Sequence, residues 1–382
     1  MKVAVPREIV PEERRVAAVP DTVAKLANAG FEVWVEQGAG AAAHFGDDAY
    51  RQQGAILANG VDRLYEGADV VLKVQAPVDG EVERIPEGAV LVGLLQPARN
   101  AELIDALAAR KVTALALELL PRISRAQSMD ALSSQASLGG YKAVVLGAAR
   151  LDKIMPMQMT AAGTIPPARV FVLGAGVAGL QAIATARRLG AVVEAYDVRP
   201  AVKEEVQSLG ARFVELPLGT AEGAGGYARE QSEEHLRRQR ELLAEHVASA
   251  DLVVTTAAVP GRKAPLLVIA DMVAGMRPGS VIVDLAADSG GNCELTEAGV
   301  ERDVGGVTIV GIRDLPRTVP VPASQTYARN LTNLLVYLVK DGELTLDFDD
   351  EIVKGCCVTH GGEVLYPEPK ASLAATSAGG QP

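Results

Sequence analysis

The chain has 382 residues, more than one hydrophobic core usually serves, and 48% of them are hydrophobic, so we expect two globular domains. The formal net charge of −11 argues against a surface that binds nucleic acid or an anionic membrane. We expect a soluble protein with neither a signal peptide nor a membrane span. Cys293, Cys356 and Cys357 form no even disulfide framework and no C-x-x-C motif, so they should stay reduced in a cytosol.

The first third of the chain alternates short apolar runs with helical patterns. The runs predict strands at residues 3–5, 32–35, 70–74, 90–95 and 112–117, with helices such as 21–29 and 100–110 between them. Apolar strands that alternate with helices form parallel sheets covered on both faces, joined by right-handed crossovers. We therefore expect an α/β fold whose first domain is doubly wound and Rossmann-like.

Two long helical patterns, residues 129–149 and 324–339, are suited to cross between two domains. They predict a first domain of residues 1–131 completed by residues 320–382, and a second of residues 132–319. Such a chain leaves a cleft between two sheets, and ligands bind at the carboxyl ends of parallel strands. The last residues, from about Lys370, have little to bury, and we expect them to be mobile.

The middle third repeats the alternation and adds a glycine motif. Strands are expected at residues 170–173, 192–196, 212–216, 252–256, 281–285 and 307–310. The first of them leads into Gly174, Gly176 and Gly179, spaced as G-x-G-x-x-G, and then into a helix at 181–189. In a dinucleotide site these glycines permit the tight turn, the approach of a pyrophosphate, and the packing of helix on strand. A glycine-rich turn in an unrelated α/β unit is the alternative.

Asp197 ends the second strand of this domain, where an acid binds both hydroxyls of the adenosine ribose. Its charge would repel a 2′-phosphate, so NAD(H) is favoured over NADP(H). Arg199 could oppose this preference, because a nearby arginine can accommodate that phosphate.

Residues 121–135 follow the last strand of the first domain and precede the crossing helix, so they should lie in the cleft. This loop concentrates polar side chains: Arg122, Arg125, Gln127, Ser128, Asp130, Ser133 and Ser134. Facing a nicotinamide, it could offer an amide to the carboxamide and hydroxyls to the ribose, with an Arg–Asp pair holding its shape. A solvated loop with an N-capping serine is the other interpretation.

A second glycine-rich segment surrounds one aromatic residue. Gly219, Gly223, Gly225 and Gly226 accompany Tyr227, and a charged helix follows. Flexible glycines beside a single ring predict a mobile loop that closes over bound nucleotide, whereas a surface insertion with a locally packed tyrosine is the alternative. The four histidines are scattered without metal-ligand spacing, so no metal site is predicted.

Several segments in order resemble one family. They are residues 122–130, 160–164, 174–179, 196–199 and 284–293. Together they resemble the NAD(H)-binding component, the soluble domain I of the alpha chain, of proton-translocating NAD(P)+ transhydrogenase. The resemblance implies a homodimer of two-domain subunits that binds NAD(H) and passes a hydride directly to NADP(H) on a partner subunit. It also implies a Re/Si-specific enzyme, a separate membrane-spanning subunit that translocates protons, and a cytoplasmic location at the inner face of the bacterial cell membrane.

The resemblance assigns site residues position by position. The loop beside the nicotinamide corresponds to Arg122, Gln127, Ser128, Met129, Asp130 and Ser133. The other cofactor-binding positions are Gly174, Gly176, Val177, Gly179, Asp197, Val198, Arg199, Gly226, Tyr227, Thr256, Ala257 and Ala258.

Alanine dehydrogenase, a related family, is the alternative. Arg15 and Lys73 resemble the residues that bind pyruvate there, and Asp288 matches its acid. Where that family carries a catalytic histidine, this chain has Gln96, which cannot exchange a proton near neutral pH. A third possibility is a non-catalytic protein that senses NAD, which the many matching site residues disfavour.

Overall fold

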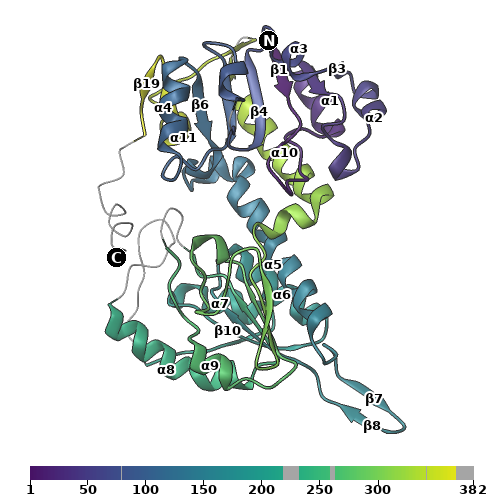
Figure 1. Cartoon of the computed structure of the whole chain (residues 1–382), viewed down its shortest axis with the longest axis vertical. Coiled ribbons are helices and arrows are strands. Elements are labelled where there is room, and N and C mark those ends of the chain that lie inside the picture. Colours follow the sequence, from purple (N-terminus) through teal and green to yellow (C-terminus); the bar gives the residue numbers. More distant parts are fainter. Residues whose placement is uncertain (79, 218–231, 259–262, 341, 367–382) are drawn as a thin grey trace, which may run out of the picture. The chain divides into compact units, whose positions relative to one another are not determined.

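The structure is a computed structural model that describes residues 1–78, 80–217, 232–258, 263–340 and 342–366 (Figure 1). The chain forms two units, Met1–Leu132 with Ser324–Pro382, and Ser133–Ala323. Helices α5 (Ala131–Arg150) and α10 (Pro320–Leu338) carry the chain from one unit to the other. In the part that the structure describes, no helix combines the length and the apolar character needed to cross a membrane.

The first unit contains an eight-stranded sheet in the order β19-β18-β6-β5-β4-β1-β2-β3. Its strands are β1 (Lys2–Val5), β2 (Glu32–Glu36), β3 (Ile56–Ala58), β4 (Val70–Gln75), β5 (Val90–Leu94), β6 (Thr113–Ala116), β18 (Cys357–His360) and β19 (Glu363–Val364). The six strands from β6 to β3 are parallel, as expected from the apolar runs. β18 and β19 continue the sheet antiparallel, which corrects the expectation of a wholly parallel sheet.

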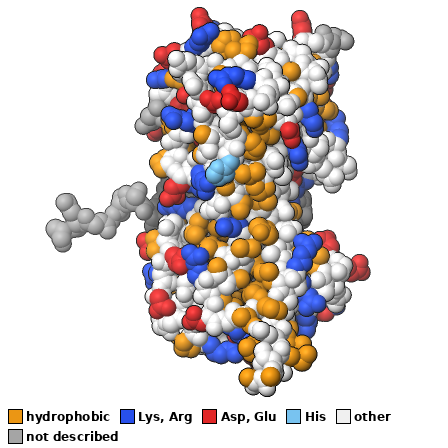
Figure 2. Space-filling view, turned by 90° about the vertical axis from the view of Figure 1, so that its right-hand side faces the viewer, with side chains coloured by type: hydrophobic (Ala, Val, Ile, Leu, Met, Phe, Trp, Pro, Cys, Tyr) orange, Lys and Arg blue, Asp and Glu red, His pale blue; other side chains and the backbone are white. Residues whose placement is uncertain are grey.

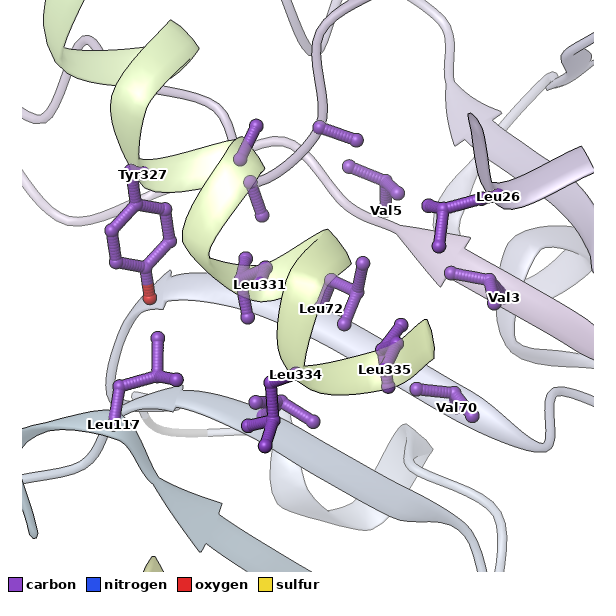
Figure 3. Close-up of a cluster of buried hydrophobic side chains, with 14 of the residues drawn as sticks. Val3, Val5, Leu26, Val70, Leu72, Leu117, Tyr327, Leu331, Leu334 and Leu335 are labelled. Carbon is purple, nitrogen blue, oxygen red and sulfur yellow. The ribbon is translucent and has the colours of Figure 1, made fainter. Parts of the chain in front are cut away.

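Helix α10 buries a stripe of side chains against the parallel strands of the first unit (Figure 3). Tyr327, Leu331, Leu334 and Leu335 are fully buried and recur with the spacing of one helix face. They meet apolar side chains of β1, β4 and the segment after β6, and burying each leucine contributes about 1.5–3 kcal/mol. The remaining helices of this unit are α1 (Pro20–Asn28), α2 (Asp47–Gln52), α3 (Val61–Tyr65), α4 (Ala101–Ala109) and α11 (Glu351–Cys356). A small sheet of β16 (Val339–Lys340) and β17 (Glu343–Leu344) follows α10.

The second unit contains a seven-stranded sheet in the order β11-β10-β9-β12-β13-β15-β14. Its strands are β9 (Arg169–Leu173), β10 (Val192–Tyr196), β11 (Arg212–Phe213), β12 (Leu252–Thr255), β13 (Val281–Asp284), β14 (Glu301–Val304) and β15 (Val307–Val310). β14 runs antiparallel at the edge, and it was not predicted because its charged residues form no apolar run. β11 is shorter than the predicted 212–216.

The helices of the second unit are α6 (Val177–Arg188), α7 (Lys203–Ser208), α8 (Glu233–Ser249) and α9 (Ala270–Ala274), together with most of α5. Helix α6 begins at Val177, four residues before the predicted start, directly on the glycine motif. A hairpin of β7 (Gln158–Thr160) and β8 (Gly163–Ile165) projects from the unit, and its strands are exposed.

Adjacent glycines in α5 allow a sharp test of helix packing in this unit. A Cβ at Gly140 would lie 2.0 Å from the backbone oxygen of Ala178 in α6, whereas a Cβ at Gly139 would meet only the flexible Leu285 side chain at 3.4 Å. Gly140→Ala should therefore destabilise the chain by about 1–3 kcal/mol through overpacking, as measured by urea unfolding. Gly139→Ala is the control, with unchanged or raised stability because alanine favours a helix by about 1 kcal/mol over glycine. Equal stability of the two variants would contradict this close approach.

Candidate functional site

The turn between β9 and α6 brings backbone segments into contact with no room for side chains. Gly174 has a positive φ of 99°, and a Cβ there would lie 2.6 Å from the Thr256 hydroxyl oxygen. A Cβ at Gly179 would lie 1.8 Å from the carbonyl oxygen of Gly174. At Gly176, by contrast, no described atom lies within 4 Å of the Cβ position. The middle glycine thus faces open space, as a turn that receives a pyrophosphate requires.

Helix α6 starts at this open side. Gly176 is its N-cap, and no side chain in the described part of the chain caps the helix. The first N–H groups of a helix lack intrahelical partners and carry a partial positive charge. Val177, at the first helical position, is exposed. The turn and the helix end therefore form a suitable site for a phosphate group.

Asp197 ties the end of β10 to the glycine turn. Its Oδ2 accepts hydrogen bonds from the backbone N–H of Ala175 at 2.7 Å and from Nη2 of Arg199 at 2.8 Å. Its Oδ1 accepts from the backbone N–H and Nε of Arg199, both at 2.9 Å. The carboxylate is 7% exposed and the guanidinium 19%. Asp197 and the turn therefore lie together, as the sequence predicted for an adenosine end, but the carboxylate already has a charged partner.

The Asp197–Arg199 pair changes what this end of the site can do. Four N–H donors occupy the carboxylate, so a ribose hydroxyl must share or replace one of them. The pair also places a guanidinium where a 2′-phosphate would lie if the carboxylate were absent. Val198, between them, is half-buried and packs on the core of the unit.

The stretch Thr256, Ala257 and Ala258 follows β12 and lies against the same turn. The backbone N–H of Thr256 donates to Leu173 O at 2.8 Å, and its hydroxyl donates to Gly174 O at 3.0 Å. The backbone nitrogen of Ala257 lies 3.1 Å from the Cβ position of Gly174. Ala258 is exposed. The fold thus brings this predicted stretch and the glycine motif together in one unit.

Two fully buried polar residues behind this stretch were not singled out from the sequence. Asp284 and Asn292 are 0% exposed. Asp284 accepts hydrogen bonds from the hydroxyls of Thr255 and Thr296 and from the backbone N–H groups of Ala286, Asn292 and Cys293, at 2.8–3.0 Å. An acidic residue directly after an apolar strand was the available signal, since parallel strands end at the site edge of such sheets.

The predicted nicotinamide loop lies largely in the first unit. It forms a short helix, η4 (Ser124–Met129), in which Ala126 and Met129 are buried in the core. Gln127, Ser128 and Arg122 are exposed, and Asp130 and Ser133 are half-buried. The apolar residues anchor the loop, so the side chain of Gln127 is available for a ligand. The proposed pairing of Arg122 with Asp130 stays a prediction.

Contacts with the C-terminal helices hold the backbone of this loop. The side-chain amides of Asn330 and Asn333 in α10 both donate to the carbonyl oxygen of Ser128 at 2.9 Å. Arg125 lies 3.1 Å from an Asp350 carboxylate oxygen, and its guanidinium also donates to the Tyr337 hydroxyl at 3.1 Å. The position of Gln127 therefore depends on residues about two hundred positions further along the chain.

Arg15 and Lys73 form a buried ionic cluster in the first unit. Arg15 is 2% exposed and contacts both carboxylate oxygens of Glu13, at 2.9 and 2.7 Å. Lys73 is 0% exposed, with Nζ 2.7 Å from Glu81 and 3.5 Å from Glu8. Each cation thus has a carboxylate partner from the chain itself.

The carboxyl groups of this cluster differ in their acidity. Burial raises the pKa of Glu8 above its usual value despite the charge of Lys73. Burial also opposes the ionisation of Glu13, but hydrogen bonds and the charge of Arg15 outweigh it and lower the pKa of that carboxyl. A cavity of about 210 Å³ adjoins Arg7, Glu8, Glu13 and Arg15.

Gln96 lines a separate cavity of about 290 Å³ with Gln75 and Asn100. Its φ is +49°, and both its N–H and that of Leu95 donate to one carboxylate oxygen of Glu118. This position therefore presents an amide where the alternative function requires a titrating group. Asp288 belongs to the second unit, is about half exposed, and lies 3.5 Å from Arg313.

The remaining predicted residues give the site little more. Gly219, Gly223, Gly225, Gly226 and Tyr227 lie outside the described residues, as does the segment from Lys370. The three cysteines are buried free thiols. Within the described ranges no three histidine, cysteine or acidic side chains gather in a way that could hold a metal ion.

The chain matches two domain families along most of its length. The family "Alanine dehydrogenase/PNT, N-terminal domain" matches residues 4–139, and "Alanine dehydrogenase/PNT, C-terminal domain" matches residues 143–367. The first of the two parts of NAD(P) transhydrogenase subunit alpha from Rhodospirillum rubrum is 50% identical over 377 residues, covering 96% of this chain and 98% of that protein. The crystal structure of transhydrogenase from Sinorhizobium meliloti superposes with a TM-score of 0.87 at 48% identity, over 95% of this chain and 100% of that one. A solved L-alanine dehydrogenase gives a TM-score of 0.82 at 28% identity, over 96% of this chain and 97% of that one.

The buried Arg15–Glu13 pair generates a stability prediction with a defined pH dependence. Glu13→Gln leaves the guanidinium buried without its charge partner and should lower the free energy of unfolding at pH 7 by about 3 kcal/mol. Because the folded pKa of Glu13 is lowered, its contribution is present above the unfolded value of about 4.3 and is lost as the pH falls through the folded value. The difference between the two proteins should therefore narrow in acid, as urea unfolding at several pH values would measure.

A surface pair provides the matched control for this experiment. Glu87 and Lys111 also lie 2.7 Å apart, but both side chains are more than 60% exposed. Glu87→Gln should leave stability almost unchanged, because water screens such pairs. Equal losses from Glu13→Gln and Glu87→Gln would contradict the role of burial.

Proposed function

Because the chain belongs to the alanine dehydrogenase/PNT family, we propose that it is the NAD(H)-binding alpha-subunit component of a proton-translocating NAD(P)+ transhydrogenase. The observation that carries the proposal is the 50% identity, over 96% of this chain, to a component of a transhydrogenase alpha subunit. The structural likeness supports the same choice, with 48% identity to a transhydrogenase and 28% to an alanine dehydrogenase.

The proposed reaction moves a hydride between two nicotinamide rings. Bound NADH supplies the hydride from C4 of its dihydronicotinamide, and NADP+ on a partner subunit accepts it, so that NAD+ and NADPH form without proton exchange with the protein. No acid or base is required, so this chain contributes binding, orientation and the exclusion of water. The protonless character of the step agrees with an amide at Gln96.

The second unit would bind the pyrophosphate and adenosine parts. The turn at Gly174, Gly176 and Gly179, with Val177 at the helix end, suits the pyrophosphate, because backbone N–H groups and the helix dipole meet open space there. Asp197 with Val198 and Arg199 would bind the adenosine ribose, and Thr256, Ala257 and Ala258 would lie along the cofactor. We further propose that Gly226 and Tyr227 belong to a loop that closes over it.

The loop after β6 would orient the reacting ring. We assign Gln127 to the nicotinamide carboxamide, because an amide both donates to and accepts from an amide. Arg122, Asp130 and Ser133 would act with it, and Ser128 and Met129 would supply backbone. The contacts to the Ser128 carbonyl support a fixed geometry, and transfer between rings is sensitive to misplacement of about 1 Å.

An alanine-dehydrogenase-like oxidoreductase is the second candidate, favoured by the shared fold and by Asp288. Reductive amination of pyruvate needs a titrating group and free cations for the substrate carboxylate. Gln96 is not a titrating group, and Arg15 and Lys73 bind carboxylates of the chain itself. These contacts speak for the transhydrogenase, and Arg15, Lys73 and Asp288 would be the catalytic set if the alternative were correct.

We infer partners from the chemistry of the proposed reaction. An NADP(H)-binding subunit would present the second ring, and a membrane-spanning subunit would move protons and hold the chain at the inner face of the bacterial cell membrane. We also infer a homodimer, because exposed apolar side chains gather on the second unit in the lower half of Figure 2. They include Ile154, Met157, Met159, Ile165 and Val192. Sedimentation of the chain as a monomer at micromolar concentration would contradict the dimer.

The decisive experiment offers the purified full chain two different hydride acceptors. With NADH deuterated at C4 and an NADP+-loaded partner subunit, deuterium should appear rapidly in NADPH by mass spectrometry. With pyruvate and ammonia, NADH oxidation should be negligible. Pyruvate-dependent turnover without the partner would overturn the proposal in favour of the alternative.

A variant of the loop tests the role given to Gln127 in the same assay. Gln127→Ala should lower the transfer rate about a hundredfold and weaken NADH binding much less, because the turn holds the other half of the cofactor. Thr160→Ala is the control, since this exposed hydroxyl of the hairpin bonds only within its own turn in the described contacts. Proportional losses of rate and affinity would show that Gln127 is a simple binding group.

The charged pair at the adenosine end predicts how nucleotide preference can be altered. The chain should bind NADH more tightly than NADPH, because the Asp197 carboxylate opposes a 2′-phosphate. Asp197→Asn removes that charge and releases Arg199, so the preference for NADH should fall by about tenfold or more in calorimetry. Asp197→Asn combined with Arg199→Ala should not gain NADPH affinity. A preference unchanged by Asp197→Asn would exclude this pair as its source.

A further inference from the structure

One buried side chain holds the segment after β12 on both sides of Ala257. The Oδ1 atom of Asn292 accepts a hydrogen bond from the backbone N–H of Ala257 at 3.0 Å. Its Nδ2 donates to the backbone oxygen of Ala257 and to that of Pro265, both at 2.8 Å. Both donors and the acceptor of the amide are thus used, and the residue is 0% exposed.

Asn292 is itself fixed to the centre of the sheet. Its backbone N–H donates to the Asp284 carboxylate at 2.8 Å, and its carbonyl accepts from Leu267 and Val268 at 2.8 and 2.9 Å. Asp284 is the last residue of β13 and is 0% exposed. The amide of Asn292 is therefore a rigid extension of the sheet rather than a loop side chain.

The contact that Asn292 makes is transmitted to the glycine turn within two residues. Ala257 follows Thr256, whose hydroxyl donates to the carbonyl oxygen of Gly174 at 3.0 Å. The nitrogen of Ala257 is 3.1 Å from the place of a Gly174 Cβ, so no gap separates this segment from the turn. Tightly packed backbone cannot absorb a displacement, and a shift of Ala257 must move the turn.

We propose that Asn292 is a positioning residue for the dinucleotide, which sets the Ala257 backbone and through it the turn at Gly174. The inference rests on the proposed function in one respect, that a nicotinamide dinucleotide binds at this turn. A primary amide suits the role because it offers a donor and an acceptor side by side to one peptide unit. A carboxylate would turn an oxygen toward two carbonyl oxygens, and an aliphatic side chain would leave both unpaired.

Two substitutions separate positioning from mere size. Asn292→Asp keeps the shape but loses both donors, and Asn292→Leu keeps similar volume without polar atoms. Each should weaken the binding of NAD+, measured by calorimetry on the folded full chain at pH 8, by about tenfold or more. Asn292→Ser, which is smaller and keeps a hydroxyl, serves if neither variant folds, and it should weaken binding in the same direction.

The pH profile gives a signature specific to the amide. In the Asn292→Asp variant, a protonated carboxyl group would carry an O–H donor and a carbonyl acceptor, and burial beside carbonyl oxygens favours protonation. The NAD+ affinity of Asn292→Asp should therefore recover toward that of the unchanged chain between pH 8 and pH 5.5, whereas that of Asn292→Leu should stay low throughout.

Thr296→Val is the matched control. It removes another hydrogen bond to Asp284, of 2.8 Å, without touching Ala257. It should lower the unfolding midpoint and leave NAD+ affinity unchanged. Unaltered affinity in the Asn292 variants, or an equal loss in Thr296→Val, would overturn the inference. If the unchanged chain binds NAD+ but passes no hydride to an NADP+-loaded partner, the proposed function fails while this inference stands; if it binds no NAD+, both fail.

Discussion

The absence of space for a single methyl group at the turn between β9 and α6 is the constraint on which the candidate site depends. A Cβ at Gly179 would lie 1.8 Å from the oxygen of Gly174, so helix and strand touch through backbone alone. The same turn is bonded to β10 through Gly174 N–H and Tyr196 O at 2.8 Å, and to the end of β12 through Thr256. Three parallel strands thus fix one loop, and its open side at Gly176 is where a pyrophosphate can approach.

Charged groups in the two units have different accessibility, and this decides what each can bind. In the first unit Arg15 and Lys73 are buried with Glu13 and Glu81, so binding an external anion there would require breaking a buried pair at a cost of several kcal/mol. In the second unit the guanidinium of Arg199 is 19% exposed beside Asp197. That pair can open toward solvent, which suits a site whose ligand must share a carboxylate.

Side chains from distant parts of the chain hold the backbone on which function would depend. Two asparagine amides of α10 hold Ser128, and the amide of Asn292 holds Ala257. In each case the amide bonds to backbone and leaves the neighbouring side chains available. A hydride transfer without acid or base places its whole demand on geometry, so rigid support of two loops is what such a reaction requires.

The sequence by itself determined the α/β class, most strands, and the glycine turn, because apolar periodicity and close backbone approach are local properties written in residue type. It also placed Asp197 beside that turn, since parallel strands end at one edge. It missed the polar edge strand β14 and the antiparallel β18, which no apolar pattern distinguishes. Only the tertiary structure decided that Arg199 occupies Asp197 and that Asn292 grips Ala257. Hydrogen bonds between residues far apart in the chain depend on packing, and a single sequence carries no local signal for them.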